Sequence, residues 1–583
     1  MNPFRRFAPF MLALAAAVPA SPFAVHAQVP HQPEAASGFA ARPAMVAPRA
    51  MVVTANGHAT DAALTVLREG GSAVDAAITA ALVLNVVEPQ SSGIGGGAFL
   101  LHAAPRGGRV SAWDGRETAP QAVDESLFLD PAGEPLAFHD AAVGGRSVGV
   151  PGLLHLFEAV HARFGRLPWA RLFAPAVGLA EGGFAVSPRL HALIAEDRHL
   201  AADPAARRLF HDAAGAPLAA GAILRNPELA TVLRTVARDG AGAFYGGEIA
   251  RDVVAAVRAA PNPGRLAPQD LAAYRAHERA PLCGRYRAYR VCGVPPPSAG
   301  GGTVLALLGV LERFALPDID PDSAFATHLF SEAGRLAFAD RDAWYGDPQT
   351  MTVTPARLLD QRYLAGRAAQ VRLDASLGRA VPGAPPGAPT RAAAAHAPEL
   401  PATSHISIVA ADGEAVALTA SIEAAFGSRR MVRGFLLNNQ LTDFSFRPAD
   451  SRGPHPNRVG PGKRPRSSMA PTLVFDPQGR LFAVSGSPGG SHIINYVAAS
   501  VAGLIDWRMA PDALLARPHA GSRNGPTEVE DTPAGRALAA RLALFGHAPV
   551  LRDLTSGLGL IVRRGDAWAG AADPRREGTA AGY

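Results

Sequence analysis

The chain has 583 residues and a formal net charge of +6, with 56 Lys and Arg against 50 Asp and Glu. This length exceeds one ordinary domain and predicts either two intertwined domains or one large layered domain. The basic balance does not indicate nucleic-acid binding, because the positive charge is almost all arginine scattered among alanine, glycine and proline. Lys463 is the only lysine, and it either has a specific role or survives by chance in an arginine-biased composition.

Residues 1–27 have the pattern of a secretory signal. Arg5 and Arg6 form a basic region, an apolar stretch covers 10–18, and Val25-His-Ala27 resembles a cleavage site. No later window offers the roughly 20 uncharged apolar residues that a membrane-spanning helix needs. We therefore expect a periplasmic or secreted protein without a membrane span.

The first elements are predicted to be helical. Residues 60–87 show helical periodicity with a break at 70–72, and the almost wholly apolar stretch 73–87 predicts a core helix. A glycine run at 93–97 then leads into a strand over 98–102. Because the glycines precede a strand instead of opening a helix, they argue against a dinucleotide site.

Helical patterns dominate from 152 to 345 and are interrupted by the Pro- and Gly-rich stretch 295–302. Cys283 and Cys292 flank a strand-like stretch and form either a disulfide or two buried free thiols. Neither has metal-ligand spacing. Residues 382–402 are a Pro-, Gly- and Ala-rich tract, after which strands are predicted over 403–422, 434–437, 470–484 and 558–563. Helices before the tract and strands on both sides of it predict layered α/β packing without sequence repeats.

Thr403 opens a predicted β-hairpin directly after the flexible tract, with its turn at Asp412-Gly413. A threonine hydroxyl is a weak nucleophile that needs a base. If the chain is cut before Thr403, its new α-amine, with a reference pKa of about 7.7–8.0, supplies that base. Taken alone, Thr403 is better explained as an ordinary β-branched strand residue after a loop.

Four polar clusters would suit an acyl-transfer site around such a nucleophile. An apolar strand ends in amide and carboxylate groups at 434–443, which could hold an ammonium, and two serines beside three cations at 461–469 could hold a carboxylate. Two glycines at a helix entrance within 485–490 could expose N–H groups to an oxyanion. Arg116, within 113–117, could grip a carboxylate. When each cluster is considered by itself, an ordinary set of turn or surface residues is an alternative interpretation.

Gly145-Arg-Ser-Val-Gly149 matches the nucleophile elbow of another hydrolase class. A true elbow lies between a buried strand and a helix, and the residues before Ser147 form a poor strand. We therefore do not expect Ser147 to be a nucleophile.

Several motifs in order resemble the γ-glutamyltransferase family of the N-terminal-nucleophile hydrolase superfamily, over about 45–583. They are GIGGGAF, DGRETAP, PPPSAGG, TSHISIV, GFLLNNQLTDFS, KRPRSSMAPT, GSPGGS and ADPRREGTAAGY. The resemblance implies a four-layer αββα sandwich built by two subunits cut from one precursor. The large subunit would span 28–402, with the tract 382–402 as its tail, and the small catalytic subunit 403–583.

The resemblance also implies the site residues. The precursor would cut itself between Ala402 and Thr403, and the Thr403 hydroxyl would then attack a γ-glutamyl carbonyl. Ser421 would hydrogen-bond the nucleophile, and the backbone amides of Gly489 and Gly490 would form the oxyanion hole. The α-carboxylate would be held by Arg116, Ser467 and Ser468, and the α-ammonium by Glu423, Gln440 and Asp443. No cofactor or metal is implied; glutathione is the default donor, and water, an amino acid or a peptide is the acceptor.

Three positions depart from the usual pattern: Ser404, Ser421 and Glu423. The resemblance implies a lid over 446–462 that is shorter than in some members of the family, so the balance between hydrolysis and transfer is open. Two alternatives remain. A cephalosporin or glutaryl acylase of the same superfamily would lack the need for Asp443, and a non-catalytic exported binding protein would have a broken nucleophile or glycine pair, which this chain does not have.

Overall fold

The computed structural model describes residues 36–105, 108–389, 393 and 402–583. The predicted signal over 1–27 and most of the tract 382–402 lie outside the described residues. Within the described ranges, no helix is both long and apolar enough to cross a membrane.

Two seven-stranded sheets form the centre of the structure, and every neighbouring pair of their strands is antiparallel. The sheet that carries the predicted hairpin contains, in spatial order, β23 (Thr579–Gly582), β2 (Met51–Thr54), β10 (Ser404–Val409), β11 (Ala415–Ser421), β3 (Gly97–Ala103), β4 (Val110–Gly115) and β7 (His277–Arg279). The second sheet contains β1 (Met45–Ala47), β22 (Ala567–Ala572), β21 (Gly559–Arg564), β17 (Leu481–Ser485), β16 (Thr472–Phe475), β9 (Tyr289–Gly293) and β8 (Leu282–Tyr286).

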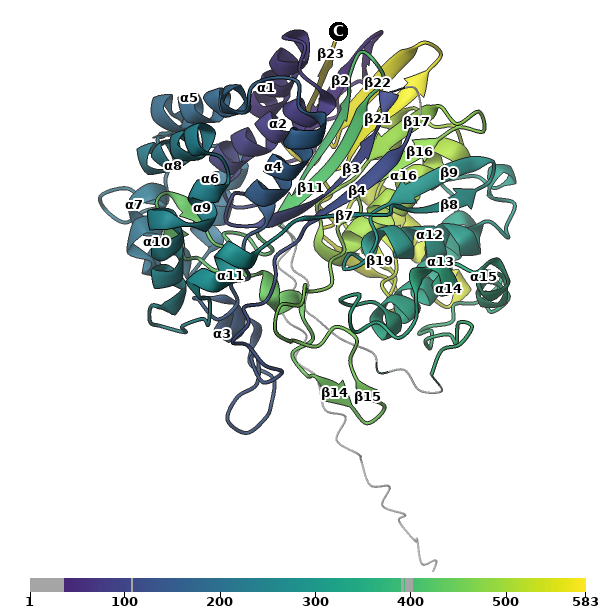
Figure 1. Cartoon of the computed structure of the whole chain (residues 1–583). Helices are drawn as coiled ribbons and strands as arrows, with labels where there is room; N and C mark the ends of the chain where they lie inside the picture. The colour runs from purple at the N-terminus through teal and green to yellow at the C-terminus, as the bar shows by residue number, and fades with distance from the viewer. Residues whose placement is uncertain (1–35, 106–107, 390–392, 394–401) are drawn as a thin grey trace, which may run out of the picture. The chain divides into compact units, whose positions relative to one another are not determined.

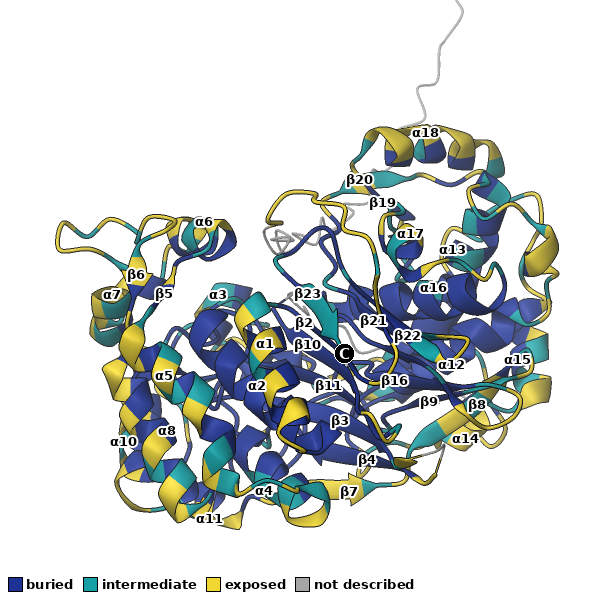
Figure 2. Cartoon of the chain, turned by 90° about the horizontal axis from the view of Figure 1, so that it is seen from above, coloured by how far each residue is buried: buried dark blue, intermediate teal, exposed yellow. Residues whose placement is uncertain are grey.

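Helices cover the outer face of each sheet, which gives the expected four-layer αββα sandwich (Figure 1). On the first sheet lie α1 (Gly57–Arg68), α2 (Ala73–Val87) and α4 (Leu153–Phe164), with α5 (Ala174–Gly182) packed on α2 and α8 (Pro227–Asp239) packed on α5. On the second lie α12 (Gly300–Leu311) and α16 (Ile493–Ile505), with α13 (Ala324–Trp344) packed on α12. Figure 2 shows the central strands of the sheets buried, the edge strands β7, β8 and β23 partly exposed, and exposed residues on the outer helices.

Shorter elements surround these layers. The helices are α3 (Phe138–Ala142), α6 (Pro188–Glu196), α7 (Pro204–Phe210), α9 (Gly242–Tyr245), α10 (Gly247–Arg258), α11 (Pro268–Ala273), α14 (Pro355–Leu358), α15 (Gln361–Ala368), α17 (Pro511–Leu515) and α18 (Pro533–Leu542). The strands are β5 (Phe184–Ala185), β6 (Ile223–Leu224), β12 (Met431–Val432), β13 (Phe435–Leu436), β14 (Ala449–Asp450), β15 (Gly453–Pro454), β18 (Ala520–Gly521), β19 (Glu528–Glu530) and β20 (Val550–Arg552).

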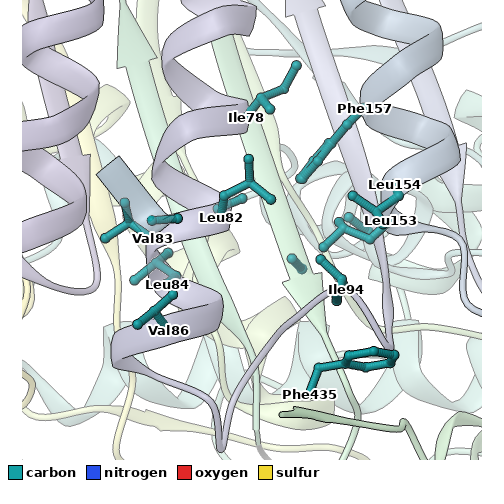
Figure 3. Packing of buried hydrophobic residues seen from close by; sticks show 14 of the residues in the cluster. Ile78, Leu82, Val83, Leu84, Val86, Ile94, Leu153, Leu154, Phe157 and Phe435 are labelled. Atoms are coloured by element: carbon teal, nitrogen blue, oxygen red, sulfur yellow. The ribbon is translucent and has the colours of Figure 1, made fainter. Parts of the chain in front are cut away.

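Helix α2 is the predicted core helix, and all of its residues are buried. It begins at a capping box, in which Asp75 N donates to Ser72 Oγ (2.9 Å) and Ser72 N donates to the Asp75 carboxylate (3.0 Å). Ile78 and Leu82 belong to the same apolar cluster as Phe157 of α4 (Figure 3). The apolar surface on every side of α2 explains why it shows no polar face.

The stretch between the two cysteines is a hairpin of two strands and not one strand. Cys283 on β8 and Cys292 on β9 lie directly opposite each other and form a disulfide, which decides between the two alternatives. The two-residue turn contains Arg287 at φ 53°, a left-handed conformation usually supplied by glycine or asparagine. Without that signal, the sequence does not reveal the turn.

The segments on either side of Thr403 are interleaved in one sheet. Strand β10 pairs with β2 on one side and β11 on the other, and β11 pairs with β3. A cut before Thr403 would therefore leave both pieces held by continuous ladders of hydrogen bonds and a shared core.

Candidate active site

Thr403 directly precedes the first residue of β10 and is buried, with 4% of its surface exposed. Its Oγ1 donates to Ser421 Oγ at 3.4 Å, and Ser421 Oγ donates to the Ala402 carbonyl at 2.7 Å. The backbone N–H of Glu423 donates to the same serine oxygen at 2.8 Å. One hydroxyl at the end of β11 thus links the candidate nucleophile to the carbonyl of the peptide bond before it.

The glycine run at 93–97 brings other backbone segments close to this serine. A Cβ on Gly96 would lie 2.2 Å from the Ser421 carbonyl oxygen, and one on Gly95 would lie 2.0 Å from the Leu436 carbonyl oxygen. Behind the nucleophile, Ser404 Oγ donates to buried Glu88 at 3.1 Å. The glycines therefore serve close backbone packing, which agrees with the argument against a dinucleotide site.

Donor groups gather in a pocket that Thr403 also lines. Arg116 is fully buried just after β4, and its guanidinium donates to the carbonyls of Pro465 (3.2 Å) and Arg466 (3.0 Å). The segment that follows these carbonyls carries Ser467 and Ser468, and both serines line the pocket with Arg116. The Arg341 guanidinium of α13 donates to Ser468 Oγ at 2.6 Å.

Acceptor groups line the same pocket. Gln440 Nε2 donates to the Asp443 carboxylate at 2.9 Å, which leaves the amide oxygen of Gln440 buried and without a hydrogen-bond partner among the described residues. Glu423, at φ 81°, accepts from Asn439 Nδ2. A left-handed conformation at a residue other than glycine costs energy and persists only where the surrounding structure holds it.

The donor and acceptor groups are joined by a direct ion pair between Arg116 and Asp443. Glu117, next to Arg116, is fully buried, and neither of its carboxylate oxygens has a hydrogen-bond partner in the described ranges. Burial raises the Glu117 pKa to about 8, although Arg116, with Nη1 3.8 Å from Oε2, opposes the rise. At neutral pH Glu117 is therefore largely uncharged, and the guanidinium keeps its full attraction for Asp443.

The glycine pair forms a turn at the entrance of α16. Gly489 has φ +133° and Gly490 φ +56°, and a Cβ on Gly489 would lie 2.7 Å from the Tyr496 ring. Gly490 and Ile493 line the pocket together with Thr403. Only glycine fits this turn without strain.

Nine of the ten predicted catalytic and substrate-binding residues line this one pocket, and the tenth, Gly489, is adjacent to Gly490 in the chain. The nine are Arg116, Thr403, Ser421, Glu423, Gln440, Asp443, Ser467, Ser468 and Gly490; Met469 and Ile493 complete the lining. The sequence indicated neither apolar residue as part of the site, because both look like ordinary core positions.

Three other sequence features lie outside this pocket lining. Ser147 is buried and donates to the Ala142 carbonyl at 2.6 Å, which is a structural hydrogen bond. Lys463 donates to the Arg458 carbonyl, and burial lowers its pKa to about 8. The segment 446–462 contains the hairpin β14–β15, which projects away from the sheets (Figure 1).

One group of possible metal ligands occurs among the described residues. His328, Glu332 and His547 are buried, with ligand atoms within 4.8 Å of one another. Their polar atoms already have partners: His328 Nε2 lies 2.7 Å from the Arg372 carbonyl, and Arg335 Nε donates to Glu332 at 2.8 Å. The group therefore serves as a structural network.

The family model for γ-glutamyltranspeptidase matches residues 59–583. The chain is 35% identical to a glutathione hydrolase proenzyme of Escherichia coli strain K12 over 479 residues, covering 79% of each protein. It is 33% identical to the acylase ACY 1 proenzyme of Pseudomonas sp. strain SE83 over 544 residues, covering 91% of this chain and 93% of the relative.

Among solved structures, the crystal structure of cephalosporin acylase from Bacillus halodurans superposes with a TM-score of 0.81 at 27% identity. The match covers 93% of this chain and 97% of the acylase. Sequence and fold agree along nearly the whole chain, and the chain belongs to the γ-glutamyltranspeptidase family of enzymes.

Proposed function

We propose that this chain is a self-processing γ-glutamyltransferase and hydrolase that acts on glutathione and related γ-glutamyl compounds. The observation that carries the proposal is that donor groups (Arg116, Ser467 and Ser468) and acceptor groups (Glu423, Gln440 and Asp443) line the same pocket as Thr403. A γ-linked glutamate has a carboxylate and an ammonium at its free end. Each set of groups suits one of these charges.

In the first reaction, Thr403 Oγ attacks the Ala402 carbonyl carbon and the peptide C–N bond breaks. The hydroxyl proton ends on the released nitrogen, which becomes the α-amine of Thr403, and water hydrolyses the resulting ester. The hydrogen bond from Ser421 to the Ala402 oxygen (2.7 Å) stabilises negative charge on that oxygen during attack. The products are a large subunit, 28–402, and a small subunit, 403–583.

In the second reaction, the new α-amine accepts the Thr403 hydroxyl proton as the oxygen attacks the γ-carbonyl of the substrate. The amide C–N bond breaks, the leaving amine takes the proton, and a γ-glutamyl ester forms on Thr403. Water or the amine of an amino acid or peptide then cleaves the ester. The backbone amides of Gly489 and Gly490 stabilise the oxyanion both when the γ-glutamyl ester forms and when it is cleaved.

A cephalosporin or glutaryl acylase is the second candidate, because relatives with acylase names cover more than nine-tenths of the chain. A glutaryl group has the carboxylate but no ammonium. The set of acceptor groups, with Asp443, Glu423 and the unpartnered amide oxygen of Gln440, favours the γ-glutamyl substrate.

The first experiment follows self-processing. Purified wild-type protein should give two bands on a denaturing gel, the smaller beginning Thr-Ser-His-Ile, and Thr403→Ala should stay uncut and inactive. Efficient cutting of Thr403→Ala at the same bond would remove self-cleavage from the proposal.

The second experiment tests the reading of the ammonium. Asp443→Asn should lower kcat/KM for a γ-glutamyl anilide by about 30- to 1,000-fold, equivalent to about 2–4 kcal/mol for truncating one partner of a buried charged contact. Turnover of the glutaryl anilide should fall much less. Asp450→Asn on the projecting hairpin is the control for the substitution itself, and equal losses on both anilides would mean that Asp443 does not read the ammonium.

We further propose that the chain is exported to the periplasm or secreted. The Cys283–Cys292 disulfide supports this, because disulfides persist in oxidising compartments. Fractionation of the source cells tests it: processed protein in the cytoplasm with an intact N-terminus would count against export.

A further inference from the structure

The two residues that follow the glycine pair are both tied to groups outside the pocket lining. Ser491 Oγ accepts a hydrogen bond from Arg523 Nη1 at 2.8 Å. His492 Nε2 lies 3.3 Å from Glu528 Oε2. The backbone turn at Gly489 and Gly490 is thus continued by Ser491, which is hydrogen-bonded to Arg523, and by His492, which lies against Glu528.

Arg523 and Glu528, the partners of Ser491 and His492, also bind each other. Arg523 meets Glu528 in a bidentate pair, with Nε donating to Oε2 at 3.0 Å and Nη2 to Oε1 at 2.9 Å. Glu528 is the first residue of β19 and is buried, whereas Arg523 lies in the loop before it and is about a quarter exposed. Such a planar pair fixes both direction and distance, which a single contact does not.

Aromatic rings pack against the turn at Gly489 and Gly490. The Tyr496 ring lies against Gly489, His492 stacks on Tyr496 with ring centroids 5.8 Å apart, and His519 lies 4.3 Å from the same ring. These rings limit movement of the turn toward α16. The Arg523–Glu528 pair limits its movement in the direction of the β18–β19 loop.

We propose that Arg523 and Glu528 are positioning residues that hold the oxyanion turn through Ser491 and His492. This inference rests on the proposed function, since it requires that Gly489 and Gly490 receive the oxyanion of the substrate. Neither residue lines the pocket. Their effect passes through the backbone of the turn, where a displacement of about 1 Å costs on the order of 100-fold in rate.

This role separates the two reactions of Thr403. During self-cleavage the Ala402 carbonyl accepts its hydrogen bond from Ser421, which lies on a different element from the glycine turn. Loss of Arg523 should therefore spare processing and slow turnover. A general loss of folding would impair both.

The experiment compares Arg523→Ala, Arg523→Lys and Ser491→Ala with wild type. In Arg523→Ala we expect normal processing, a 10- to 100-fold lower kcat/KM for a γ-glutamyl anilide, and an equal loss of affinity for a γ-boronic acid analogue of glutamate. Boron bonded to Thr403 Oγ carries a hydroxyl where the oxyanion forms. Inhibition by free L-glutamate, which reports binding of the head group alone, should change less than twofold.

The remaining variants sharpen the result. Arg523→Lys keeps the charge without the bidentate geometry and should fall between wild type and Arg523→Ala. Arg536→Ala removes a matched arginine that pairs with Asp531 on the surface and should leave turnover unchanged.

Unchanged turnover and boronate affinity in Arg523→Ala would overturn the proposal, as would equal losses of glutamate and boronate binding. If Arg523→Ala does not fold, Ser491→Ala decides by the same two affinities. Wild-type protein that processes itself but turns over no acyl anilide would overturn the proposed function and this inference together, whereas an active wild type with an unaffected variant overturns only the inference.

Discussion

Replacing Glu117 with glutamine should change how the stability of the protein depends on pH. The Glu117 carboxyl is fully buried, and no described residue hydrogen-bonds either of its oxygens. Burial raises its pKa from 4.5 to about 8 against the attraction of Arg116. At about 1.36 kcal/mol per pKa unit, this difference corresponds to on the order of 5 kcal/mol.

The sign follows from proton linkage. The folded protein binds the Glu117 proton more tightly than the unfolded chain, so unfolding releases a proton between pH 4.5 and about 8. Wild-type stability relative to Glu117→Gln should be greatest below pH 4.5 and should decline until the pH passes about 8. The Glu117→Gln variant keeps a neutral side chain throughout and lacks this decline.

The assay is the thermal unfolding midpoint of both proteins at pH 5, 7 and 9, in the same processing state as judged by gel. The midpoint of Glu117→Gln should rise relative to wild type at each step. Glu125→Gln, at an exposed carboxylate that pairs with Arg458, controls for the substitution. A wild-type-to-variant difference that stays constant from pH 5 to 9 would refute the argument that Glu117 is protonated in the folded protein.

Two further predictions follow from close contacts and buried histidines. Gly96→Ala would place a methyl group 2.2 Å from the Ser421 carbonyl oxygen, so self-cleavage should slow at least about tenfold on a gel time course. Gly178→Ala, with open space around it, is the control, and equal rates of self-cleavage in the two variants would contradict the argument. Burial lowers the His547 pKa to about 4, so wild type should lose stability as pH falls from 6.5 toward 4 and His547→Gln should lose less; parallel unfolding midpoints from pH 7.5 to 4.5 would show that His547 does not titrate in this way.

The sequence predicts the local elements of this fold well where the chemistry is local. Apolar residues throughout 73–87 predict α2, and alternation with an Asp412-Gly413 turn predicts the β10–β11 hairpin. The Cys283–Cys292 hairpin was missed because its turn uses Arg287 at φ 53° without a glycine. Tertiary packing, and not a local preference, stabilises that turn.

The candidate site is predictable residue by residue through the family motifs, but its internal pairing is not. Arg116 and Asp443 were expected to bind opposite ends of a substrate; in the structure they bind each other. They are separated by 327 positions, and no periodicity or spacing reports a contact over that distance. The same holds for Arg341, which reaches Ser468 from α13.

The Arg116–Asp443 pair bears on specificity under the proposed function. A γ-glutamyl head group brings a carboxylate to Arg116 and an ammonium to Asp443, so one buried ion pair is exchanged for two. A glutaryl group brings only the carboxylate. It draws the guanidinium away from Asp443 without supplying a cation in return, so Asp443 keeps its hydrogen bond from Gln440 but loses its ion pair, and breaking a buried ion pair is costly. The pocket thereby selects the zwitterion mainly by penalising a ligand that offers only one charge, and less by extra attraction. Glu117, which is largely uncharged at neutral pH, keeps this penalty large because it does not compete with Asp443 for the Arg116 guanidinium.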